Sequence, residues 1–280
     1  MSQSYSDEQR MLAQWCMAAQ FFSEEKLRAA MQRIFNTDDI DLQHIVDRTN
    51  NSLSIFSLEL RSRMDQLTGT RDWALVNTNA DEISKQATPY SPVELSILKA
   101  LIEQICTEPS GNFCITYHEA VREAARLGPS GFSLTDAGLL LDKLCGDGWL
   151  NRANGGFVVM GARATIELQS FLNDSYQDLL HECSLCKEIA TCGIVCDGCG
   201  AALHPCCVDR VVEAGGSRGL ACPQCHKAIR EPSRFGPGED GVPIEHQESI
   251  AEDGSEDEQT ALKRMKAEPV ATQDSDDDNH

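Results

Sequence analysis

The chain has 280 residues, of which 41% are hydrophobic, and its 24 basic and 44 acidic residues give a formal net charge of −20. This length suits about two domains. The charge excludes a protein that coats nucleic acid through bulk positive charge. No apolar run reaches the roughly 18 residues that a membrane-spanning helix needs, and the N-terminus shows no basic stretch followed by an apolar core. We therefore expect a soluble, intracellular protein.

Residues 1–86 carry the element order of a winged-helix domain, in which three helices precede a β-hairpin. Ser6 and Gln9 form a capping box ahead of a first amphipathic helix, which is expected to run to about Phe22. Two more helices and two strands are expected at 23–34, 39–50, 55–64 and 71–77.

The same order repeats in residues 88–161 and predicts a second winged-helix domain. Ser91 and Thr116 each begin a helix with a glutamate three residues later, as a capping box requires. The third helix begins at either Ser133 or Thr135, and Asn154-Gly155 forms the turn of the closing hairpin.

Three segments follow the second repeat. A connecting helix is expected over 162–180, and a cysteine-rich segment over 181–230. Residues 231–280 hold 15 of the acidic residues and four of the basic ones. This composition predicts a disordered acidic tail. The whole chain is expected to be an α+β protein.

The cysteine-rich segment contains nine of the 13 cysteines. Eight of its residues form four pairs, each with two residues between the partners, which lets both ligands of a pair reach one tetrahedral zinc ion. The eight candidate zinc ligands are Cys183, Cys186, Cys196, Cys199, His204, Cys207, Cys222 and Cys225. They saturate two ions, so the zinc is expected to be structural and not catalytic.

The spacing leaves the pairing of these ligands open. A cross-brace joins the first pair to the third and the second to the fourth, whereas sequential ribbons join neighbouring pairs. Cys192 and Cys206 are spare. The four cysteines outside the segment lie among apolar residues and are interpreted as small core residues; they are Cys16, Cys106, Cys114 and Cys145.

The ligand order resembles a RING-type C4HC3 zinc finger. A plant-homeodomain finger shares that order but usually has an aromatic residue where this chain has Leu220. Together with the two winged helices, the chain to about residue 230 is similar to the family of non-SMC element one of the SMC five–six complex. The segments that carry this resemblance are Trp73-Ala74-Leu75-Val76-Asn77-Thr78, Ile83-Ser84-Lys85-Gln86-Ala87-Thr88, Cys183-Ser184-Leu185-Cys186 and Cys222-Pro223-Gln224-Cys225.

The resemblance implies the cross-brace pairing and a nuclear, chromosome-associated subunit of a ubiquitin ligase that acts in recombination and DNA repair. Its implied partners are a MAGE-family subunit, a kleisin subunit and a ubiquitin-conjugating enzyme. The implied contacts with the conjugating enzyme are Leu185 and Pro223, with Ile189 adjoining them. Many RING ligases carry an activating arginine at the position of His226, so weak activity is expected without the partner.

The third helix of each repeat is acidic, which disfavours DNA binding through it. Residues 38–51 carry four aspartates against Arg48, and residues 133–147 carry three against Lys143. DNA contact is therefore expected mainly through the complex. Trp15, Phe21 and Phe22 are candidate partner contacts, because they crowd one short segment. Three functions compete: a ubiquitin-ligase subunit, a structural scaffold in the same complex, and a DNA-binding regulator.

Overall fold

The computed structural model describes residues 6–79, 89–215, 219–230 and 232–238. All of them belong to one compact unit, Met1–Ile244. The expected domain boundary at 86–88 and nearly all of the acidic tail lie outside the described residues. We refer to residues 6–79 as the N-terminal region, 89–180 as the central region and 181–238 as the cysteine-rich region.

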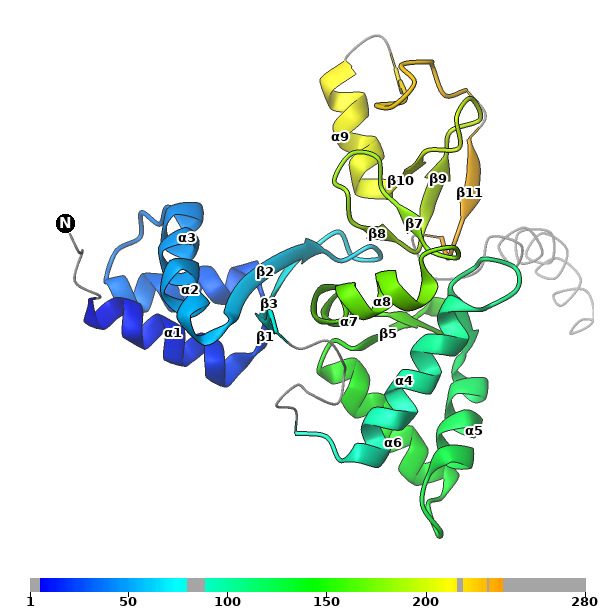
Figure 1. Cartoon of the computed structure of the whole chain (residues 1–280), viewed down its shortest axis with the longest axis horizontal. Helices are drawn as coiled ribbons and strands as arrows, with labels where there is room; N and C mark the ends of the chain where they lie inside the picture. Colours follow the sequence, from blue (N-terminus) through cyan, green and yellow to red (C-terminus); the bar gives the residue numbers. More distant parts are fainter. Residues whose placement is uncertain (1–5, 80–88, 216–218, 231, 239–280) are drawn as a thin grey trace, which may run out of the picture. The chain divides into compact units, whose positions relative to one another are not determined.

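The N-terminal region contains three helices and a three-stranded antiparallel sheet in the order β1-β3-β2 (Figure 1). The capping box of Ser6 and Gln9 is confirmed, and the Ser23 hydroxyl accepts a bond from the Lys26 amide at 3.4 Å at the start of the second helix. The elements are α1 (Asp7–Ala19), β1 (Phe21–Ser23), α2 (Glu24–Phe35), α3 (Leu42–Leu53), β2 (Leu58–Met64) and β3 (Arg71–Asn77).

Three details of this region differ from the sequence-based expectation. Phe22 does not continue the first helix: α1 ends at Ala19 and Phe22 pairs with Trp73 in the sheet. The third helix begins at Leu42, because the Asp41 carboxylate caps it by accepting from the His44 amide at 3.1 Å. Residues 54–56 form a 3₁₀ turn instead of the start of a strand.

The central region repeats this order around a larger core. Capping boxes begin three of its helices, at Ser91, Thr116 and Ser133, so the third helix begins at the first of the two expected positions. Its sheet has the order β4-β6-β5. The elements are α4 (Pro92–Cys106), β4 (Cys114–Thr116), α5 (Tyr117–Leu127), α6 (Leu134–Gly146), β5 (Leu150–Ala153) and β6 (Phe157–Met160).

Two helices, α7 (Ala162–Glu167) and α8 (Gln169–Tyr176), replace the single connecting helix expected over 162–180. Helix α7 contributes to two cores. Ile166 packs with Ala74 and Val76 of the N-terminal sheet, whereas Ala164 belongs to the central core, as do Leu168 and Leu172. No helix among the described residues is long and apolar enough to span a membrane.

The cysteine-rich region consists of short strands, metal-site loops and one helix, α9 (Pro205–Gly215). Its last strand, β11 (Ser233–Phe235), pairs with β9 and lies beyond the expected boundary at residue 230. The apolar Phe235 explains this extension, because it packs against Phe113 and His181. The other strands are β7 (His181–Glu182), β8 (Ile189–Ala190), β9 (Gly193–Val195) and β10 (Ala202–Leu203).

Candidate metal centres

Three of the four ligand pairs adopt the same backbone turn. In each of them the amide four residues after the first cysteine donates to that cysteine's carbonyl at 2.9 Å, from Lys187, Gly200 and His226 respectively. These three residues all have positive φ, between 60° and 74°. The Gly198 amide also points at the Cys196 sulfur, at 3.4 Å. The repeated turn brings both sulfurs of each pair to one side.

The fourth pair is built differently, at the start of a helix. His204 directly precedes α9, and Cys207 lies in its first turn, where its amide donates to the His204 carbonyl at 3.1 Å. Helical geometry places residues three apart on the same face. The helix therefore presents the imidazole and the thiol of this pair together.

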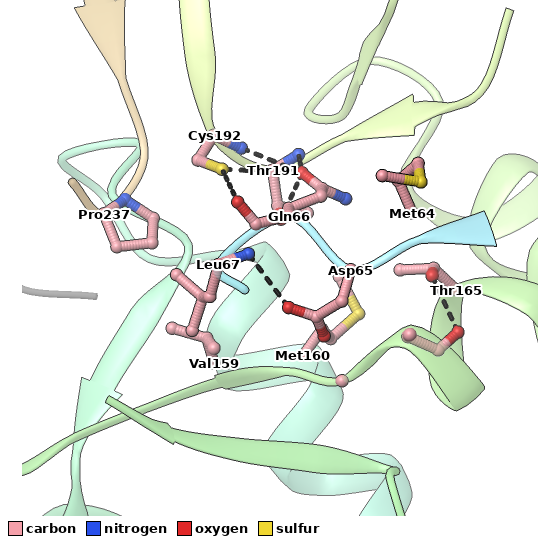
Figure 2. Close-up of a pocket in the computed structure, with 12 residues that line it drawn as sticks. Met64, Asp65, Gln66, Leu67, Val159, Met160, Thr165, Thr191, Cys192 and Pro237 are labelled. Carbon is pink, nitrogen blue, oxygen red and sulfur yellow. Dashed lines mark hydrogen bonds between the residues drawn. The ribbon is translucent and has the colours of Figure 1, made fainter. Parts of the chain in front are cut away.

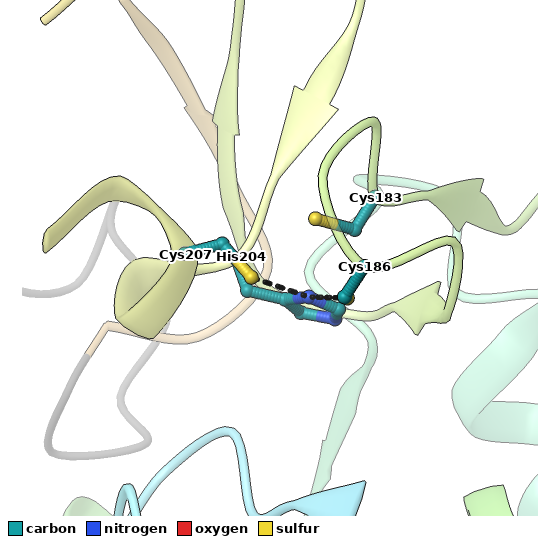
Figure 3. A group of neighbouring side chains, drawn as sticks. All are labelled: Cys183, Cys186, His204 and Cys207. Carbon is teal, nitrogen blue, oxygen red and sulfur yellow. Dashed lines mark hydrogen bonds between the residues drawn. The ribbon is translucent and has the colours of Figure 1, made fainter. Parts of the chain in front are cut away.

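The first candidate metal centre combines the first and third pairs (Figure 3). The ligand atoms of Cys183, Cys186, His204 and Cys207 all lie within 4.8 Å of one another. His204 Nδ1 is 3.3 Å from the Cys186 sulfur and 3.9 Å from the Cys207 sulfur. A tetrahedral zinc site has nitrogen–sulfur edges of about 3.6 Å, so these atoms fit such an ion.

The tautomer of His204 suits this role. Its Nε2 lies 3.0 Å from the backbone oxygen of Ile189. A carbonyl oxygen only accepts, so Nε2 carries the proton and Nδ1 keeps its lone pair for a metal. The ring is thus oriented by a backbone contact on the side opposite the ligand sulfurs.

The second candidate metal centre combines the second and fourth pairs: Cys196, Cys199, Cys222 and Cys225. The Cys196 and Cys225 sulfurs are 3.8 Å apart, and those of Cys199 and Cys222 are 3.6 Å apart. With metal–sulfur bonds of about 2.3 Å, a tetrahedron has sulfur–sulfur edges of about 3.8 Å. The grouping is therefore interleaved and not sequential, and each cluster can hold a metal ion.

Without a cation, the neighbouring thiols of the first cluster hinder one another's ionisation. The hydrogen bond from the Cys186 thiol holds the pKa of Cys183 far below its usual value, and the same bond raises the pKa of Cys186. Burial, followed by the nearby Cys183 thiolate, raises the pKa of Cys207 to about 12. A bound divalent cation removes this conflict, because it stabilises all the thiolates together.

The two spare cysteines stay outside both clusters. Cys192 is buried, and burial raises the pKa of its thiol to about 12, so it remains a neutral thiol. Cys206 is half-buried beside Cys207. Of the four cysteines outside the cysteine-rich region, three are buried as expected and Cys145 is half-buried; the buried ones are Cys16, Cys106 and Cys114.

A cavity of about 360 Å³ lies beside the first metal centre, lined by three of its four ligands and by residues of the N-terminal hairpin. It contains three arginines, Arg63, Arg71 and Arg210, and one acidic residue, Glu188. A zinc ion with three thiolates and one imidazole carries a net charge of −1. The arginines offset part of this negative charge, to a degree that solvent and salt screening limit.

The three expected conjugating-enzyme contacts have different surroundings. Leu185, between the first two ligands, is 36% exposed, and Pro223 is half-buried. Ile189 is only 5% exposed, because its side chain packs into the central core. Ile189 therefore offers no side-chain surface to a partner in this conformation, and Leu185 is the accessible apolar group.

The three aromatic residues expected to contact a partner lie mostly inside the chain's own packing. Phe22 is a core residue of the N-terminal region, and the half-buried Trp15 lies against it with ring centroids 4.6 Å apart. The half-buried Phe21 packs with Ala74 and Ile166, between the sheet and α7. In the isolated chain Phe22 offers no surface to a partner.

The sequence analysis missed the residues that surround the first metal centre from the N-terminal region. Arg63 and Gln66, on the β2–β3 hairpin, hydrogen-bond to Glu188 and Ile189, more than 120 residues away. No spacing motif signals such a contact. The arginine in question, Arg63, lies in β2 and is buried in the structure, but its burial cannot be recognised from the sequence.

Comparison with known proteins places the chain in a family. A family model described as "Nse1 non-SMC component of SMC5-6 complex" matches residues 9–168, more than half of the chain. Non-structural maintenance of chromosomes element 1 of Schizosaccharomyces pombe is 29% identical over 206 residues, which cover 72% of this chain and 85% of that protein. Its Homo sapiens homolog is 25% identical over 185 residues, covering 66% and 68%.

A solved structure of an Nse1-Nse3-Nse4 complex contains a chain with the same fold. The TM-score is 0.65 at 22% identity, and the match covers 82% of this chain and 99% of that one. The family model extends across the N-terminal and central regions, and the solved structure matches most of the chain. The chain belongs to the family of the Nse1 non-SMC component of the SMC5-6 complex.

Proposed function

We propose that this chain is a RING-type ubiquitin-ligase subunit of the SMC5-6 complex. The observation that carries the proposal is the interleaved grouping of eight ligands into two full tetrahedral sets. Such a cross-brace is typical of RING fingers. Each set holds one structural zinc ion and leaves no coordination position open, so the metal activates no water.

The mechanism that follows is one of positioning. The thioester chemistry belongs to the conjugating enzyme, and this chain holds that enzyme in a reactive geometry. Leu185 is the best candidate for the contact, because it is exposed on the turn between Cys183 and Cys186. Pro223 occupies the equivalent place between Cys222 and Cys225 and is the second candidate.

The N-terminal and central regions are proposed to be tandem winged helices that bind protein. Each has three helices and a three-stranded sheet. Residues 38–51 and 133–147, which contain the third helix of each region, carry more acidic than basic residues. The solved complex contains Nse3 and Nse4 beside its Nse1 chain. We infer a MAGE-family partner and a kleisin partner for this chain, with a nuclear, chromosome-associated role in DNA repair and DNA contact mainly through the complex.

A structural scaffold in the same complex is the second candidate function. The burial of Ile189 reduces the apolar surface available to a conjugating enzyme, and His226 stands where many ligases have an activating arginine. Both observations favour weak activity by the chain alone.

The deciding experiment is a ubiquitin-transfer assay with the full chain, alone and with its MAGE-family partner, against a panel of conjugating enzymes. The proposal expects weak activity alone and a clear increase with the partner. The Cys186→Ser variant, which loses a metal ligand, is the inactive control. If the complex is inactive with every conjugating enzyme, the scaffold function is the correct one.

A further inference from the structure

The tip of the β2–β3 hairpin is held in a fixed conformation. The Asp65 carboxylate accepts from the Leu67 amide at 3.0 Å (Figure 2). Through the same oxygen, the carboxylate also accepts from the Thr68 amide at 2.8 Å. Its other oxygen accepts from Asn151 of the central region at 2.7 Å, and the Asp65 side chain is buried. These bonds fix the conformation of the tip and attach it to the central region.

Gln66, the next residue, contacts the cysteine-rich region with both ends of its amide. Its Oε1 accepts from the backbone amides of Thr191 at 2.9 Å and Cys192 at 3.3 Å (Figure 2). Its Nε2 donates to the Ile189 carbonyl at 3.2 Å. This carbonyl is also the acceptor for His204 Nε2. One backbone oxygen thus accepts a hydrogen bond from the hairpin and another from a candidate metal ligand.

Arg63, three residues before Gln66, contacts Glu188, the residue that precedes Ile189. It is 7% exposed, donates to the Thr165 carbonyl at 2.7 Å, and forms an ion pair with Glu188. The Glu188 carbonyl in turn accepts from the Cys183 amide at 2.9 Å and closes the first metal-site turn. The hairpin therefore holds both Glu188 and Ile189, which end the loop that carries Leu185.

We propose that the hairpin tip, mainly through Gln66, is a positioning element for the first metal centre. It fixes the Ile189 carbonyl, the carbonyl fixes the His204 ring, and the ring presents Nδ1 to the metal. Groups that orient a ligand from outside the coordination sphere commonly change metal affinity by 10- to 100-fold. Because linkage is reciprocal, metal in the first centre also strengthens the attachment of the hairpin. The second centre has no part in this coupling.

The first test uses Gln66→Glu in the full zinc-loaded chain. Glutamate keeps an acceptor for the Thr191 and Cys192 amides but cannot donate to the Ile189 carbonyl. We expect two zinc ions still to bind and one of them to transfer to a chromophoric chelator about tenfold faster than in the wild type. The matched control is Gln104→Glu, which adds the same charge at an exposed position of α4. Equal release rates for all three chains would overturn the proposal.

Gln66→Ala keeps the test informative if the glutamate variant folds poorly. Alanine removes both halves of the contact. We expect it to release the same ion faster and also to lose hydrogen-exchange protection at the Thr191 and Cys192 amides, which the glutamate variant retains. Faster release of both ions, or of neither, would contradict a role confined to the first centre.

The reciprocal test compares Cys186→Ser in the first centre with Cys199→Ser in the second. The readout is hydrogen exchange at the Leu67 and Thr68 amides, which lie in the N-terminal region. We expect faster exchange with Cys186→Ser and unchanged exchange with Cys199→Ser. An equal response to both would show that metal loss acts through general unfolding. Neither readout requires ubiquitin transfer, so this proposal and the proposed ligase function can fail separately.

Discussion

The two candidate metal centres differ in how they are built and in what surrounds them. The first combines one turn with the start of α9, whereas the second combines two turns. The first lies against the N-terminal hairpin, through contacts of Arg63 and Gln66 with residues next to its ligands. The second is hydrogen-bonded within its own segment: the Cys196 amide donates to Ala201 and the Cys222 amide to Lys227, both at 2.9 Å. One of its ligands, Cys199, is exposed, whereas no ligand of the first centre is.

This difference teaches that two equivalent sets of ligands can have different structural roles. The ligand spacing alone predicts two similar structural ions. The packing places the first centre at the junction of three regions, whereas the contacts of the second centre lie within the cysteine-rich region. The following predictions test this contrast, beginning with the largest effect.

Removing both metal ions is expected to unfold residues 181–238 and to spare the other two regions. The core of the cysteine-rich region has nine buried residues, and four of them are candidate ligands. The remaining apolar surface is too small to replace structural zinc, whose binding commonly supplies about 10 kcal/mol or more. Hydrogen exchange with and without chelator measures the effect, and elemental analysis should give two zinc ions per chain. Unchanged exchange in 181–238, or fewer than two ions, would refute this expectation.

The two ions are expected to leave at different rates, the second centre losing its ion first. Cys199 is exposed to a chelator, whereas the ligands of the first centre are buried or half-buried. Zinc release to a chromophoric chelator should therefore show two phases. Cys199→Ser should abolish the fast phase, and Cys186→Ser should abolish the slow one. The reverse assignment of the phases would remove the contrast between the centres.

Leu185→Ala is expected to lower partner-stimulated ubiquitin transfer by about tenfold or more, a loss of about 1.4 kcal/mol in binding the conjugating enzyme. Leu185 is 36% exposed and belongs to no core cluster of the described residues, so zinc content and partner binding should be unchanged. The matched control is Leu179→Ala, at an exposed leucine outside the cysteine-rich region. If the complex with Leu185→Ala is as active as the wild type, Leu185 is not the contact with the conjugating enzyme.

Local signals in the sequence predicted much of this fold. Helix starts at Ser6, Ser91 and Thr116 follow from residues three positions apart, and the structure has capping boxes at all three. The start of the third central helix was left open between Ser133 and Thr135, and the structure has a capping box at Ser133. The spacing did not predict which pairs share a metal ion. A two-residue gap shows that two ligands form a pair, but it does not show which other pair completes the site.

Contacts between distant segments could not be predicted in this way. Strand β1 was missed because its pairing partner, β3, lies about 50 residues further along the chain. The contacts of Gln66 form because the β2–β3 hairpin packs between the central and cysteine-rich regions. No periodicity or motif in the sequence predicts this packing. Helix α7 likewise packs into two cores, because Ala164 belongs to the central core and Ile166 contacts the N-terminal sheet.

Cys192→Ser is expected to have the smallest effect. Cys192 lies in the cysteine-rich region but outside both ligand sets, and its sulfur is 3.8 Å from the Gln66 carbonyl oxygen. A serine hydroxyl can donate to the same oxygen, which offsets part of the lost apolar burial, so we expect a stability change of about 1 kcal/mol or less. Elemental analysis should still give two zinc ions, whereas Cys196→Ser should lose one. A loss of zinc from Cys192→Ser would mean that a spare cysteine replaces one of the eight ligands, and the contrast between the two centres would then need a different ligand assignment.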